Sequence, residues 1–106
     1  MSFCVDIYQL CQHFPAHERF ALSNQMERAA VSIASNIAEG ASRSTDMDFA
    51  HFLEISLGSA FEIETQLNIA NALHYITPDE YEKVKAKLIE IQKGLGKFIG
   101  ILRQKK

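Results

Sequence analysis

In this 106-residue sequence, aspartate, glutamate and histidine are the candidate metal ligands, because pairs of an acid and a histidine bind metals in helical proteins. Helical di-iron proteins place Glu and His three residues apart on two helices, so that inward side chains hold the metals. No glutamate here is followed three residues later by a histidine, and Asp48 with His51 forms a single acid–histidine pair. The histidines also lack the spacing of a zinc site. We therefore expect no metal, and an Asp48–His51 pair on a solvated helix face.

Nucleophilic catalysis has equally little support. Cys4 and Cys11 stand seven residues apart on one expected helix, about 10 Å along its axis, which is too far for a disulfide. Neither has an adjacent cation to lower its pKa, and both are expected to act as small hydrophobic residues in the reducing cytoplasm. The segment "GLGKFIG" has the composition of a phosphate loop but lies within a helical pattern. We expect a non-enzyme without cofactor or small-molecule substrate.

Charge is unevenly distributed along the chain, whose net charge is −2. Residues 1–75 carry three basic and nine acidic side chains, whereas residues 76–106 carry eight basic and four acidic ones. The whole protein is therefore not a polycation that binds nucleic acid by charge alone. Five lysines of the last segment are candidate nucleic-acid contacts, although a solvated helix flank explains them as well: Lys83, Lys87, Lys93, Lys97 and Lys105.

Helical periodicity runs through almost the whole chain, and no strand pattern or internal repeat competes with it. It predicts an all-α fold, an antiparallel up-down-up-down four-helix bundle, as a single domain over residues 1–106. No apolar run approaches the roughly 18 to 20 residues of a membrane span, so no membrane association is expected. The four predicted helices cover residues 3–14, 17–39, 46–75 and 78–102.

Local signals mark the ends of these helices. Gly40 follows the last periodic residue of the second helix and predicts a left-handed cap. Ser44 or Thr45 is expected to cap the start of the third helix. In "ITPDE", Thr77 predicts an N-cap that forms a capping box with Glu80, with proline at the first helical position.

Each predicted helix carries an apolar stripe for a shared core. In the second helix the stripe includes Met26, Ile33 and Ile37, with Arg28, Ser32, Ser35 and Glu39 on the far side. In the third it includes Leu53, Ala60, Ile63 and Leu67, and it extends to His74. In the fourth it follows a heptad pattern through Tyr81, Val84, Leu88, Ile91, Leu95, Phe98 and Leu102.

The second and third helices have more apolar faces than one core requires. Val31, Ala34 and Ala38 form an additional strip on the second helix, within a run rich in small residues. The third helix has apolar flanks on both sides of its stripe, with Leu57, Phe61 and Ala72 on one side and Ile55, Ile69 and Leu73 on the other. Two interpretations remain open: these residues widen a single core, or they lie at the interface of a homo-oligomer.

The segments "FPAHERFALSNQMERAAVSIASNIAEGASR" and "FAHFLEISLGSAFEIETQL" carry a more specific signal. They resemble the bacterial four-helix bundle family encoded in intervening sequences of large-subunit ribosomal RNA genes, which also includes the accessory variability protein of diversity-generating retroelements. The resemblance covers about residues 14–75, and Ala34 stands where the family often has proline. The matching residues include Phe14, Pro15, Glu18, Gln25, Arg28, Ala29, Ser32, Asn36, Glu39, Gly40, Arg43, Phe49, Phe52, Gly58 and Ser59.

The resemblance implies a homopentamer of four-helix bundles and an association with nucleic acid. This chain, at a pI near 6.0, lacks the strong positive charge of the retroelement relative. We therefore predict a cytoplasmic, non-enzymatic homo-oligomeric interaction protein, with RNA binding through the last helix as the alternative. The candidate interface or functional residues are Arg28, Val31, Ser32, Ala34, Asn36, Ala38, Glu39, Arg43, Leu57 and Phe61.

Overall fold

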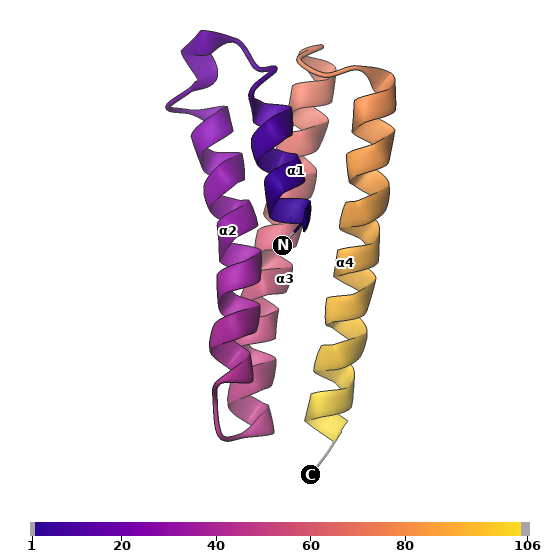
Figure 1. Ribbon diagram of the computed structural model, residues 1–106. Helices are drawn as coiled ribbons and strands as arrows, with labels where there is room; N and C mark the ends of the chain where they lie inside the picture. The colour runs from indigo at the N-terminus through magenta and orange to yellow at the C-terminus, as the bar shows by residue number, and fades with distance from the viewer. Residues whose placement is uncertain (1, 105–106) are drawn as a thin grey trace.

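Four antiparallel α-helices make up the protein, as seen in a computed structural model that describes residues 2–104 (Figure 1). The elements are α1 (Ser2–Cys11), the short 3-10 helix η1 (Ala16–Glu18), α2 (Leu22–Ala41), α3 (Asp46–Ala72) and α4 (Pro78–Gln104). No strand occurs within the described residues, so the predicted all-α bundle is confirmed. No helix in this part of the chain is both long and apolar enough to cross a membrane.

The helices occupy the corners of a square in cross-section. α1 contacts α2 and α4, and α3 also contacts α2 and α4, so α1 and α3 lie at opposite corners. α1 has 10 residues whereas α3 and α4 have 27 each, so α1 covers only the upper half of the bundle in Figure 1. The lower half of the bundle is therefore formed by α2, α3 and α4 (Figure 1).

The hydrophobic core is divided into two clusters along the bundle. The first lies beneath α1 and includes Ile7, Met26, Ile63, Leu67 and Leu88, all fully buried. The second lies beyond the end of α1 and is built by α3 and α4 alone. Its buried members are Ala50, Leu53, Leu95, Ile99 and Leu102.

Three predicted helix ends differ from the structure by three residues or more, and the first of them is the end of α1, which lies at Cys11 rather than Phe14. The second helix begins at Leu22 rather than near residue 17, because the backbone turns away at Ala21 (φ −124°, ψ −103°) after the η1 turn that follows Pro15. The third helix ends at Ala72, and His74 follows it with a φ of 62°. His74 is therefore exposed in the connection to α4 and does not lie on the core stripe.

Gly40 is not a left-handed cap. It lies inside α2, which continues to Ala41, and no described glycine has a positive φ. A Cβ atom at this position would lie 2.8 Å from Cδ1 of Phe49 and 2.9 Å from Cβ of Phe52. The absence of a side chain at Gly40 thus allows the end of α2 to approach the start of α3.

The predicted α4 stripe fails at Phe98. Val84, Leu88, Leu95 and Leu102 are buried, but Ile99 takes the place predicted for Phe98. The Phe98 ring is partly exposed and packs edge-on against the Phe49 ring, with centroids 5.0 Å apart. Ile37 of α2, predicted on the core stripe, is also partly exposed.

The capping predictions for α3 and α4 are confirmed. Thr45, not Ser44, caps α3, because its hydroxyl oxygen accepts a hydrogen bond from the Asp48 amide at 3.1 Å. At α4 the Thr77 hydroxyl oxygen accepts from the Glu80 amide, and the Glu80 carboxylate accepts from the Thr77 amide at 2.8 Å. The capping box thus provides acceptors for the Thr77 and Glu80 amides, which have no carbonyl partner at the start of the helix.

We expect Thr45→Ala to lower the free energy of unfolding by about 1 kcal/mol, the usual cost of losing an N-cap. Urea denaturation followed by circular dichroism measures the change. Ser44→Ala is the matched control, since Ser44 is exposed in the same loop and makes no hydrogen bond within residues 2–104. Equal stability losses in the two variants would contradict the assignment of Thr45 as the cap.

Candidate functional site

The candidate residues of α2 lie on two different faces. Ser32, Asn36 and Arg43 lie on the edge that faces α3, where the Ser59 hydroxyl donates to the Ser32 hydroxyl at 2.9 Å. The Arg43 guanidinium lies over the Phe52 ring of α3, 4.8 Å from its centroid. Ser32 was predicted on the far side of the helix, and this is wrong, because Ser32 contacts Ser59 of α3, whereas Arg28, Ser35 and Glu39 of the same predicted side are exposed.

Hydrogen bonds tie this edge together. The Asn36 amide donates to both the carbonyl and the hydroxyl oxygen of Ser32, at 2.9 and 3.1 Å. Ser56, fully buried on α3, donates to the Ile33 carbonyl across the interface between the two helices. Arg43, in the connection that follows α2, forms an ion pair with Glu39 in the last turn of that helix. The small side chains of this part of α2 therefore allow close polar contact with α3 in the same chain.

Val31, Ala34 and Ala38 lie on the other face of α2. Together with Cys4 and Ser35 they line a shallow, mostly apolar hollow of about 370 Å³. Val31 is 41% exposed, and Cys4 in the first turn of α1 borders this strip. The strip is thus an open apolar surface beside α1.

The two candidates on α3 divide in the same way. Leu57 is half-buried and packs against the second core cluster, so it contributes to the core of its own chain. Phe61, one turn further on, is 51% exposed. The predicted interface residues therefore do not form one continuous surface.

The lysines of α4 lie in different surroundings. Lys87 forms an ion pair with Asp6 of α1 at 2.6 Å, while Lys83, Lys93 and Lys97 are exposed. At 100° per residue, Lys93 lies about 120° around the helix from Lys87. The fifth lysine, Lys105, lies outside the described residues. These positions do not form one narrow strip.

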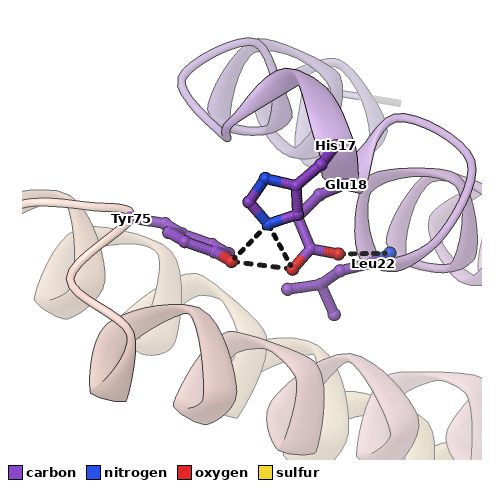
Figure 2. A network of polar contacts seen from close by, with 4 residues as sticks. All are labelled: His17, Glu18, Leu22 and Tyr75. Atoms are coloured by element: carbon purple, nitrogen blue, oxygen red, sulfur yellow. Dashed lines mark hydrogen bonds and ion pairs between the residues drawn. The ribbon is translucent and has the colours of Figure 1, made fainter.

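A polar network that the sequence did not predict joins η1 to the α3–α4 connection (Figure 2). The Tyr75 hydroxyl donates to the Glu18 carboxylate at 2.7 Å, and the other carboxylate oxygen accepts from the Leu22 amide at 3.3 Å. His17 lies beside both groups, with Nε2 3.4 Å from the Tyr75 oxygen. Phe14 packs against the Tyr75 ring, with centroids 5.4 Å apart. The network thus fastens the α1–α2 connection to the far end of α3.

The network has electrostatic consequences for its two titratable partners. The hydrogen bond from Tyr75, followed by that from the Leu22 amide, holds the pKa of Glu18 below its ordinary value of 4.5. The same hydrogen bond, followed by desolvation, raises the pKa of Tyr75. The contact therefore favours a charged carboxylate and a neutral phenol, which suits a structural clamp.

This lowered pKa predicts a pH-dependent stability. A carboxylate whose pKa is lower in the folded state stabilises the fold above its unfolded pKa, and this contribution is lost as the pH falls through the folded pKa. We therefore expect Glu18→Gln to be less stable than the wild type near neutral pH, with the gap closing on acidification from about pH 5 to about pH 3. Urea midpoints across this range measure the gap.

Glu90→Gln provides the control for this titration, because Glu90 is exposed and makes no hydrogen bond or ion pair within residues 2–104. Its stability relative to the wild type is measured over the same pH range. A Glu18→Gln gap that does not close on acidification would show that the clamp does not depend on the charged carboxylate.

Groups for covalent or metal chemistry are sparse. Burial, with a smaller contribution from Glu27, raises the pKa of the Cys11 thiol to about 12, whereas reactive cysteines have lowered values. Within the described part of the chain, no group of three or more His, Cys, Asp or Glu side chains is arranged to hold a metal. Asp48 and His51 are both exposed, as expected for a solvated face.

A buried Ser56, a close approach at Gly40 and the Ser32–Ser59 contact together characterise the α2–α3 packing of this bundle. The sequence profile described as "23S rRNA-intervening sequence protein" matches residues 1–97. The chain belongs to this family. No curated protein shows significant similarity to it.

A solved structure supports the same assignment. It is a protein of unknown function from the S23 ribosomal protein family of Bacteroides thetaiotaomicron VPI-5482, determined at 1.70 Å resolution. This protein is 32% identical, the match covers 92% of each chain, and the TM-score is 0.86. This member of the 23S rRNA-intervening sequence protein family thus shares its fold with the Bacteroides protein.

Proposed function

We propose that this chain is a non-enzymatic interaction protein that acts as a homo-oligomer, with five copies as the expected stoichiometry. The observation that carries the proposal is the exposure of apolar side chains at two opposite corners of the bundle. Ile55 and Ile69 of α3 and its C-cap residue Leu73 are 40%, 45% and 50% exposed. Spacings of 14 and 4 residues are close to whole numbers of helical turns, so the three side chains lie on one side of the helix. We call them the α3 face.

The second apolar surface is the open strip beside α1, formed by Cys4, Val31, Ala34, Ile37 and Ala38. We call it the α1–α2 face. It lies toward the α1 corner, which is diagonally opposite α3. A monomer gains nothing from exposing either surface, and burial of both in contacts between copies would remove them from water.

Two different faces also suit a ring. A two-fold interface joins one surface to the same surface of a second copy, whereas a ring joins different surfaces head to tail. An odd number of copies cannot be closed by two-fold contacts alone. Pairing of the α3 face with the α1–α2 face of the next copy would therefore allow a ring, and the family resemblance gives five as its expected number of copies.

Light scattering at micromolar concentration tests the assembly. The expected mass is five times that of the 11.9 kDa chain. A clean monomer would overturn the proposal, and a closed assembly with another number of copies would overturn the stoichiometry alone.

We expect Ile69→Ser on the α3 face to weaken assembly without unfolding the chain. Ile69 is 45% exposed in the single chain, so burial of this exposed part in each contact is worth about 1 kcal/mol, which is about fivefold in the dissociation constant of each interface. Ile101→Ser is the matched control, because Ile101 is similarly exposed but lies on α4, outside both faces. The mass of each variant, measured on dilution, reports the effect, and equal weakening by both variants would contradict this interface.

RNA binding through α4 is the second candidate, supported by the basic excess of residues 76–106. The ion pair between Lys87 and Asp6 weakens this candidate, because Lys87 would have to exchange its carboxylate for a phosphate. Filter binding of structured RNA at two salt concentrations tests it. Salt-dependent retention would support RNA binding, and no retention at either concentration would remove it.

A further inference from the structure

A polar hollow of about 360 Å³ lies on the outer seam between α2 and α3. The Ser32–Ser59 contact lies at its base, and the antiparallel register places Arg28 and Glu62, each about one turn away from this contact, across the hollow from each other. Ala29 is its one apolar lining residue. The lining residues are Gln25, Arg28, Ala29, Ser32, Ser59 and Glu62.

One side of the hollow has hydrogen-bond donors without acceptors. The Arg28 guanidinium and the Gln25 amide make no hydrogen bond or ion pair within residues 2–104. Ser32 accepts hydrogen bonds from Asn36 and Ser59, and no acceptor for its own hydroxyl hydrogen lies in the same part of the chain. A group rich in acceptors, such as a carboxylate, would satisfy this side.

The other side has acceptors without strong donors. Glu62 accepts one long hydrogen bond, from the Gln66 amide nitrogen at 3.4 Å. Gln66 itself is only 4% exposed, and its Oε1 atom is buried without a hydrogen-bond donor among the described residues. Buried acceptors of this kind are uncommon in native proteins. Gln66 does not line the hollow, so Glu62 is the acceptor that a ligand would meet, and a group rich in donors, such as an ammonium, would pair with it.

We propose that this hollow binds a free α-amino acid, with its carboxylate toward Arg28 and Ser32 and its ammonium toward Glu62. The lining has no net charge, so a simple anion would be repelled by Glu62 and a simple cation by Arg28. A zwitterion satisfies both sides at once. With Ala29 as the one apolar contact, the site favours a small polar side chain such as that of serine. This ligand goes beyond the proposed assembly and does not depend on it.

Titration of the ¹⁵N-labelled full chain with L-serine tests the proposal. The hollow is open to solvent, so the expected dissociation constant is on the order of 1 mM for a ligand of this size. Amide shifts should centre on Arg28, Ser32, Ser59 and Glu62. N-acetyl-L-serine and L-serine amide each lack one of the two charges, and each should bind about tenfold more weakly.

Two variants separate the two ends of the ligand. Arg28→Gln and Glu62→Gln should each weaken L-serine binding by about tenfold, and loss of binding of N-acetyl-L-serine should follow Arg28→Gln alone. Arg19→Gln is the matched control, because Arg19 borders a separate hollow beside Gln12 and Glu27. It should leave the affinity unchanged, and circular dichroism should show all three variants to be folded.

Several results would overturn the proposal. Absence of shifts up to roughly 20 mM L-serine would exclude a site of the expected strength. Shifts centred on Gln12 and Glu27, or loss of binding in Arg19→Gln, would place the ligand in the other hollow. Equal binding of the acetylated ligand would show that the ammonium is not recognised.

Discussion

Gly40→Ala should lower the free energy of unfolding by about 2–3 kcal/mol, although alanine is the better helix former. The added Cβ would lie 2.8 and 2.9 Å from side-chain atoms of Phe49 and Phe52, and 3.2 Å from the Phe49 carbonyl oxygen. Cβ of Phe52 and the carbonyl oxygen belong to or adjoin the backbone, so no rotamer change relieves these contacts. α2 and α3 must separate where they approach most closely.

Thermal and urea unfolding measure this effect, and the melting temperature should fall on the order of 10 °C. Gly58→Ala is the matched control on α3, since nothing lies within 4 Å of a Cβ at that position. It should stabilise the protein by about 0.5–1 kcal/mol through helix propensity. Stabilisation by both substitutions would contradict the close approach at Gly40.

Ile7→Ala should cost about 3 kcal/mol, as is typical of an isoleucine that is removed from a packed core. Ile7 is fully buried in the first core cluster. α1 has 10 residues, which is too short to persist as an isolated helix in water. Its attachment therefore depends on the side chains it buries, and we expect the variant to loosen α1 as a unit.

Hydrogen exchange of the α1 amides, together with urea unfolding, measures this loosening. Val5→Ala is the control on the same helix, because Val5 is 54% exposed. It should change stability by less than about 0.5 kcal/mol and leave α1 protected. If Ile7→Ala lost stability while α1 exchange stayed unchanged, α1 would not be held by this contact.

The capping box of Thr77 and Glu80 was predictable because its parts lie three residues apart and meet whenever a helix begins there. The same reasoning applies to Thr45. The buried residues Leu53, Ile63 and Leu88 were also predictable, because helical periodicity alone places them on one side. Such local signals identified the bundle correctly.

Predictions failed where a distant part of the chain sets the local conformation. Gly40 was expected to end α2 because glycine usually does so, but its role is to leave space for Phe49 and Phe52. Phe98 was expected in the core because the heptad places it there, but Ile99 is buried in its place. The Glu18–Tyr75 contact joins residues 57 apart in the sequence, and no spacing pattern predicts it.

The sequence by itself determined the helical class, the four helical segments and the start of each of the last two helices, because hydrophobic period and capping act between residues three or four apart. Only the tertiary structure decided which apolar faces are buried. α1 covers half of the bundle, and this leaves Val31, Ala34 and Ala38 open while Ser32 turns toward Ser59. Burial depends on what lies opposite a side chain, and that depends on the lengths and order of all four helices.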